Sequence, residues 1–176
     1  PSLPVFPKPT DIPAPHQWSG LIEQREYLCN GALVHWDGPL QEVTSPICES
    51  VDNTLRPRVI GHYPLLTERE ALAALDAAVT AYNHGRGQWP AMSVEDRIRC
   101  VEDFVHRMVE QRDEVVRRLM WEIGKTLPDA EKEFDRTVVY IRDTVDALKD
   151  LDRTASRFVI EQGIVAQVRR APLGVV

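Results

Sequence analysis

Cysteines and histidines are the first residues to test for chemistry, and in this chain they are widely scattered. The cysteines are Cys29, Cys48 and Cys100. No two cysteines have the CxxC spacing of a zinc site, and no two of the five histidines have HxxxH spacing. Cys100 lies within a helical pattern, which favours a small core or surface thiol over a nucleophile. We therefore predict no catalytic residue in this chain.

Arg136 is the most informative candidate, because of the helical segment that carries it. At 100° per residue, the apolar side chains of this segment share one face. They are Phe134, Val138, Ile141, Val145 and Leu148. Arg136 lies on the opposite side with Val139 and Tyr140. A guanidinium group there can bind a phosphate or a carboxylate through two parallel hydrogen bonds. The alternative is a solvated surface arginine.

The pattern that carries Arg136 begins at Thr67, where the sequence becomes helical. Thr67 and Glu70 form a capping box, which marks a helix start. Gly85 and Gly87 end that first helix, and Gly124 is expected to end the third. Apolar spacing at 3.6 residues per turn predicts four helices in all. Their approximate ranges are 67–82, 93–108, 113–123 and 128–151.

The first 66 residues have a different character, because they hold ten of the 13 prolines. Proline disfavours helix, so we predict an extended arm over 1–18, with a disordered tail as the alternative. Asn30-Gly31 is typical of a tight hairpin turn and predicts short strands over 27–34. Residues 59–63 are expected to form a further short strand.

The pattern of the last residues again predicts strands. Residues 158–162 and 164–169 predict a hairpin about Gly163. The apolar run 171–176 resembles the start of a buried strand, so we expect the chain to be part of a larger domain.

Composition excludes several classes of protein. The 176 residues carry a formal net charge of −6, which argues against a nucleic-acid binder. No apolar run approaches the length of a membrane span, so no membrane partner is expected. An odd number of cysteines without a visible secretory leader favours the cytoplasm.

Several motifs along the chain occur in the order of one known family. They are the Ala-rich helix 71–82, Trp89 with Arg97, Glu122–Lys125, 129–131 and Arg170–Val176, preceded by a hairpin over 27–46. In this order they resemble the N-terminal part of the aldehyde dehydrogenase superfamily. The resemblance implies an α/β fold with an N-terminal arm and short hairpins, four helices, and the start of the oligomerisation β-arm and of the nucleotide-binding sheet.

The resemblance also implies a division of the chain. Residues 1–66 would be the arm with short strands, and 67–151 would be helices flanking the nucleotide-binding domain. Residues 152–170 would be the hairpin of the oligomerisation arm, and 171–176 the first strand of the nucleotide-binding sheet. The family's catalytic Cys and general-base Glu lie downstream, so the 176 residues alone are expected to be inactive.

Substrate and ligands follow from the same resemblance. Residues 133–137 are similar to the element in which NADP-dependent, non-phosphorylating glyceraldehyde-3-phosphate dehydrogenases place an Arg toward the substrate phosphate, and Arg136 falls on that position. The whole enzyme would oxidise a small-molecule aldehyde with NADP or NAD, as a homo-oligomer, either dimer or tetramer. Some members bind a monovalent cation between the positions of Glu122 and Thr44; the alternative is that Glu122 only makes a helix-end hydrogen bond. The competing function is a non-enzymatic helical interaction module.

Overall fold

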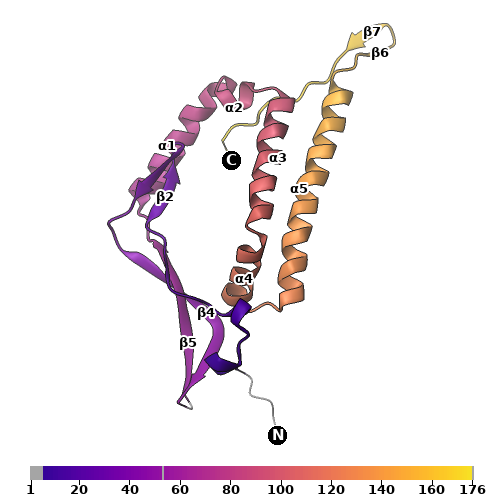
Figure 1. Ribbon diagram of the computed structural model, residues 1–176. Helices are drawn as coiled ribbons and strands as arrows, with labels where there is room; N and C mark the ends of the chain where they lie inside the picture. The colour runs from indigo at the N-terminus through magenta and orange to yellow at the C-terminus, as the bar shows by residue number, and fades with distance from the viewer. Residues whose placement is uncertain (1–5, 53, 176) are drawn as a thin grey trace. The chain divides into compact units, whose positions relative to one another are not determined.

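The computed structural model describes residues 6–52 and 54–175, and they divide into two compact units (Figure 1). The strand unit takes the described residues up to Leu72 together with Arg112–Phe134. The helix unit takes Ala73–Gln111 and the described residues from Asp135 onward. Both helices and strands are present, as predicted for an α/β protein.

The strand unit contains five strands. They are β1 (Ile22–Glu23), β2 (Glu26–Cys29), β3 (Ala32–His35), β4 (Leu40–Val51) and β5 (Thr54–Pro64). One sheet has the order β1-β5-β4, and β2 pairs with β3 in a separate hairpin. Asn30 and Gly31 both have positive φ, of 51° and 75°, which confirms the predicted turn. The predicted strand at 59–63 is the end of the much longer β5.

The N-terminal segment is not extended throughout, so that part of the prediction is wrong. Short 3-10 turns occupy Pro9–Asp11 and Ala14–His16. Proline is tolerated at the start of such turns because its missing N–H has no partner there in any case. Ile12 packs against the core of the strand unit, and Trp18 is part of that core. Residues 1–5 lie outside the described residues.

The core of the strand unit is built around two tryptophans. Trp18, Ile60 and Trp121 are buried together, and the Trp18 and Trp121 rings lie 6.3 Å apart between centroids. The indole N–H of Trp121 donates to the carbonyl of His16 at 2.8 Å. The Arg58 guanidinium lies over the Trp121 ring and donates to the carbonyl of Trp18 at 2.7 Å.

Five α-helices are found in the described part of the chain. They are α1 (Glu68–Tyr82), α2 (Gln88–Ala91), α3 (Val94–Glu110), α4 (Arg112–Ile123) and α5 (Leu127–Ala155). Four of them were predicted, and the single turn α2 was not. At the start of α1, the Glu70 carboxylate accepts the backbone N–H of Thr67 at 3.0 Å, as a capping box requires.

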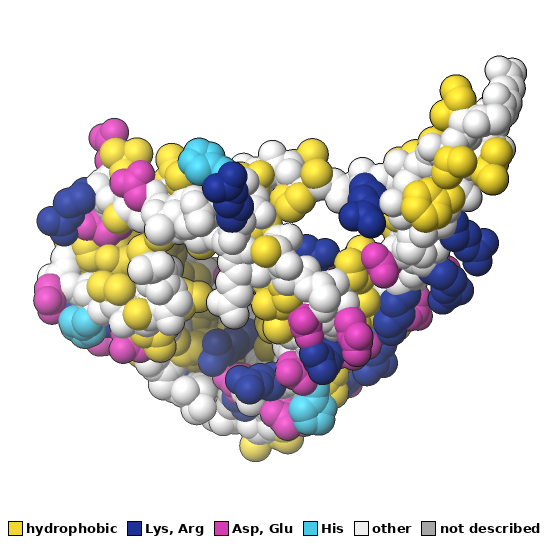
Figure 2. All heavy atoms as spheres, turned by 90° about the horizontal axis from the view of Figure 1, so that it is seen from above, with side chains coloured by type: hydrophobic (Ala, Val, Ile, Leu, Met, Phe, Trp, Pro, Cys, Tyr) yellow, Lys and Arg dark blue, Asp and Glu magenta, His cyan; other side chains and the backbone are white. Residues whose placement is uncertain are grey.

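The helix unit is formed mainly by α3 and α5, which lie side by side (Figure 1). Ile98 and Val105 of α3 are buried, as are Val138 and Val145 of α5. After α5, β6 (Val159–Glu161) and β7 (Ile164–Ala166) form the predicted hairpin about Gly163. Hydrophobic side chains gather on this projecting arm, at the right of Figure 2.

The final apolar run has no strand pairing in the described residues, which end at Val175. Leu173 is 97% exposed. The assignment of 171–176 to a nucleotide-binding sheet therefore stays a prediction, as does the rest of the division inferred from the resemblance, and Val176 lies outside the described residues.

Candidate functional site

Helix α5 carries the candidate anion ligand, and its start is fixed by a local cap. The Thr126 hydroxyl accepts the backbone N–H of Asp129 at 3.4 Å and donates to the Asp129 carboxylate at 2.7 Å. Pro128 lies in the first turn, where a helix tolerates its missing N–H. Phe134, Val138 and Val145 are buried, so the predicted core face of this helix is confirmed.

Arg136 is exposed on the other side of α5, and its neighbours there are also open to solvent. Val139 is 50% exposed and Tyr140 is 60% exposed. Among the described residues, the Arg136 guanidinium has no ion-pair or hydrogen-bond partner. Its donors are therefore available to an anion, but the structure shows no anion there, so the role of Arg136 stays a prediction.

An apolar groove of about 350 Å³ runs beside this face, between α3 and α5. Thr137, Tyr140 and Thr144 line it from α5, and Ile98 lines it from α3. Trp89 of α2 lies at the groove as well. Most of the other residues that line the groove are aliphatic, so its surface is mainly hydrophobic. Tyr140 lies both at this groove and on the side of α5 that carries Arg136.

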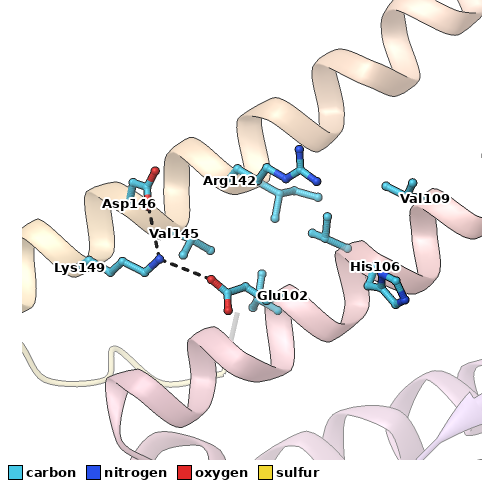
Figure 3. A pocket seen from close by; sticks show the side chains of 10 residues that line it. Glu102, His106, Val109, Arg142, Val145, Asp146 and Lys149 are labelled. Carbon is cyan, nitrogen blue, oxygen red and sulfur yellow. Dashed lines mark hydrogen bonds and ion pairs between the residues drawn. The ribbon is translucent and has the colours of Figure 1, made fainter.

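A second, charged groove of about 430 Å³ lies along the same two helices (Figure 3). The Lys149 ammonium lies 3.4 Å from the Glu102 carboxylate of α3 and 3.4 Å from the Asp146 carboxylate of its own helix. Partial burial opposes the charged form, but these two hydrogen bonds outweigh it and raise the pKa of Lys149. Arg142 extends from α5 over the valines between the helices.

Glu122 and Thr44, the predicted cation ligands, lie on two elements of the strand unit that contact each other. Glu122 is on the last turn of α4, and Thr44 is on β4, against which α4 packs. Both side chains are exposed. Within the described residues, the Glu122 carboxylate has no ion-pair partner. No cation is held in the structure, so this site also stays a prediction.

The contact between α4 and β4 is made by the residues next to these two. The Ser45 hydroxyl donates to the carbonyl of Trp121 at 2.5 Å and accepts the N–H of Ile47 at 3.1 Å. Ser45 is only 3% exposed. This contact was not predicted, because the two residues are 76 positions apart. The only sequence signal was Pro46, which disfavours continued strand pairing.

The three cysteines do not form a site. Cys29 and Cys48 are half-buried on β2 and β4, Cys100 is exposed on α3, and all three are free thiols. In the described residues, no group of three or more His, Cys, Asp or Glu side chains could hold a metal ion.

Comparison with known proteins decides the family. The aldehyde dehydrogenase family model matches residues 43–176. The chain belongs to the aldehyde dehydrogenase family. A malonate-semialdehyde dehydrogenase from Bacillus cytotoxicus is 30% identical over 142 residues, which are 81% of this chain and 28% of that protein. A malonate-semialdehyde dehydrogenase from Bacillus cereus is 28% identical with the same coverage.

Solved aldehyde dehydrogenases share the fold. An NAD-dependent aldehyde dehydrogenase from Sinorhizobium meliloti matches 81% of this chain and 26% of its own, with a TM-score of 0.65 and 20% identity. Aldehyde dehydrogenase 21 from Physcomitrella patens, in complex with the reaction product succinate, matches 80% of this chain and 26% of its own, with a TM-score of 0.61 and 23% identity. The predicted α/β fold, the N-terminal part of the aldehyde dehydrogenase fold, is confirmed.

This aldehyde dehydrogenase chain spans about a quarter of the length of the relatives it matches. None of the helices described for it is both long enough and apolar enough to cross a membrane.

Proposed function

We propose that this chain is the N-terminal part of an enzyme that oxidises an aldehyde bearing a carboxylate, with NAD or NADP, to the carboxylic acid. Malonate semialdehyde is the favoured substrate. The observation that carries the proposal is the match to the aldehyde dehydrogenase family together with relatives named for malonate semialdehyde. The family match also favours this function over an interaction module.

Arg136 is the residue of this chain that would recognise the substrate. A guanidinium pairs with a carboxylate as well as with a phosphate, in the same two-donor geometry. The relatives named above act on a carboxylate-bearing aldehyde by their names, and none of those names mentions a phosphorylated one. Glyceraldehyde 3-phosphate, which the sequence suggested, is therefore kept as a comparison substrate and not as the proposed one.

The chemistry requires residues outside these 176. In the whole enzyme, a Cys thiolate would attack the aldehyde carbon to give a thiohemiacetal. Once that carbon has lost its hydride it would be a thioester, which a Glu-activated water would hydrolyse to the acid and the free thiolate. NAD or NADP, when bound, supplies the acceptor for the hydride. The balance is aldehyde, water and oxidised cofactor giving acid, reduced cofactor and a proton. This chain would contribute the anion contact of Arg136 and part of the scaffold.

Two further assignments belong to the same proposal. Glu122 and the backbone oxygen of Thr44 would hold a monovalent cation, since a carboxylate and a carbonyl are hard oxygen donors. The exposed Glu122 carboxylate and the contact of α4 with β4 fit that donor set. The β6–β7 hairpin would join copies into a cytoplasmic homo-oligomer. In the division of the chain, 67–151 would flank the nucleotide-binding domain.

Replacement of Arg136 by alanine tests the substrate assignment in the enzyme that contains these residues. We expect kcat/KM for malonate semialdehyde to fall about 10- to 100-fold, because a charge-assisted hydrogen bond contributes about 1.5–3 kcal/mol. Propanal has the same number of carbons and no anion, so its kcat/KM should stay nearly constant. Arg136→Lys should recover part of the loss, since an ammonium lacks the two-donor fork.

Arg142→Ala is the matched control, because Arg142 is also an exposed arginine of α5. Its side chain lines the charged groove and not the apolar groove beside Arg136. It should leave both substrates unaffected. Equal losses for malonate semialdehyde and propanal with Arg136→Ala would make Arg136 structural. A loss confined to glyceraldehyde 3-phosphate would restore the phosphate assignment. The 176 residues alone, expected to be inactive, are the negative control.

A further inference from the structure

The strand β4 departs from regular pairing where it meets α4. Thr44 pairs with Val59, and the next ladder pair is Cys48 with Pro57. Across β4 and β5, which the structure describes in full, Ser45 to Ile47 therefore have no ladder partner. Such a bulge turns the backbone of a strand away from its neighbour and presents it to another element.

Helix α4 ends against this bulge. Gly124 has a φ of 76°, and its N–H donates to the carbonyl of Met120 at 3.0 Å, which closes the last turn. A Cβ placed on Gly124 would lie 3.4 Å from Cγ of Pro46, so the helix end and the bulge are in van der Waals contact. The C-terminal end of a helix is a negative pole, which favours a cation.

One buried hydroxyl joins the two elements. Ser45 bonds the carbonyl of Trp121 and the N–H of Ile47, so it uses its donor and an acceptor at once. Thr44 directly precedes Ser45, and Glu122 directly follows Trp121. The bond therefore fixes the backbone next to each of the two proposed cation ligands.

We propose that Ser45 is a positioning residue for a monovalent cation, holding the bulge of β4 on the end of α4 so that the oxygens of Thr44 and Glu122 face a common point. The inference rests on the proposed cation site. Without the hydroxyl, the bulge and the helix end would keep their apolar contacts but lose the bond that sets their register. A rigid ligand pair binds a cation more tightly than a mobile one, because less ordering is needed on binding.

The test is thermal unfolding of the intact enzyme in increasing KCl, with tetramethylammonium chloride holding the ionic strength constant. A ligand bound only by the folded state raises the melting temperature with a dependence that reports its affinity. We expect Ser45→Ala to shift the K⁺ midpoint about five- to tenfold upward, the scale of one neutral hydrogen bond. Ser45→Thr keeps a hydroxyl and should stay closer to wild type, whereas Glu122→Gln should abolish the K⁺ response.

Ser50→Ala is the matched control, since Ser50 is on the same strand and its hydroxyl has no partner among the described residues. A lower melting temperature without a shifted K⁺ midpoint in Ser45→Ala would make Ser45 merely structural and overturn the inference. If wild type has no K⁺ response, or Glu122→Gln keeps it, the cation site itself fails. If Ser45→Ala keeps the wild-type K⁺ midpoint while Glu122→Gln abolishes the K⁺ response, the cation site is supported and the positioning role of Ser45 is refuted.

Discussion

The strand unit and the helix unit are stabilised in different ways. In the strand unit, side chains bond backbone groups that are distant in sequence: Trp121 bonds His16, and Arg58 bonds Trp18. In the helix unit, α3 and α5 meet through an apolar stripe and through Lys149, whose carboxylate partners lie on both helices. Directional bonds to the backbone specify one geometry, whereas an apolar stripe is less selective.

The difference implies that the strand unit is the less tolerant of substitution. The Trp121 side chain takes part in a ring contact with Trp18, a cation–π contact with Arg58 and a hydrogen bond to the carbonyl of His16 at once. A buried valine of the helix unit, such as Val145, contributes packing alone. Truncation of the Trp121 side chain removes several coupled interactions, whereas truncation of Val145 to alanine removes only two methyl groups.

Trp121→Ala and Val145→Ala test this comparison, and the first has the largest expected effect. Truncation of a buried tryptophan costs about 3–5 kcal/mol, while the two methyl groups of valine cost about 2 kcal/mol. Hydrogen exchange of the intact enzyme, read at peptides from β4 and from α3, reports the loss in each unit separately. Equal losses from the two variants would show that the units do not differ in this way.

Local signals in the sequence predicted many of the elements. The capping box at Thr67 and Glu70 and the Asn30-Gly31 turn each act within four residues, so their outcome depends little on the rest of the chain. The apolar period of α5 likewise predicted which side is buried and which side carries Arg136. These features were visible because their causes are close in sequence.

Long-range pairing could not be predicted. Strand β4 pairs with β5 despite Pro46 and Pro57, which disfavour strands when read locally. The bulge tolerates the first proline, and the pairing itself depends on the core around Trp18 and Trp121. The Ser45 bond to Trp121 depends on that same tertiary contact, so Pro46 could mark an interruption of strand pairing but no local pattern could indicate the partner.

A second prediction compares the exposed hairpins of the two units. In β6–β7, Ile160 pairs with Val165, and these side chains are 73% and 62% exposed. In β2–β3, Leu28 pairs with Leu33, and these side chains are 69% and 66% exposed. The β2–β3 hairpin still has packing of its own, because the Tyr27 and Trp36 rings meet edge to face, whereas every residue of β6 and β7 is exposed.

We therefore expect β6–β7 to be the hairpin that pairs with another copy, because an exposed strand edge is a template for a further strand. Ile160→Lys should weaken self-association of the enzyme about tenfold or more, and Leu28→Lys should leave it nearly unchanged. Sedimentation velocity across a concentration series measures both. The opposite ranking would assign association to the strand unit, and no change in either variant would remove both hairpins from the interface.

The smallest expected effect concerns the capping box of α1 in the strand unit. Hydrogen bonds from Thr67 and then from Arg69 lower the pKa of Glu70 from 4.5 to about 2. Since the folded state holds this carboxylate ionised, Glu70 stabilises the fold above its unfolded pKa, and the contribution is lost as the pH falls through about 2. Glu68 is an exposed carboxylate in the same turn.

Glu70→Gln should therefore lower the melting temperature near neutral pH, and the difference from wild type should shrink as the pH falls below about 4. Glu68→Gln is the matched control, because it removes one charge from the same helix start and leaves in place the hydrogen bonds of Thr67 and Arg69 to Glu70. Melting curves of wild type and both variants between neutral and acid pH provide the measurement. A wild-type advantage over Glu70→Gln that stays constant down to acid pH would mean that packing of the side chain, and not the ionised cap, holds the start of α1.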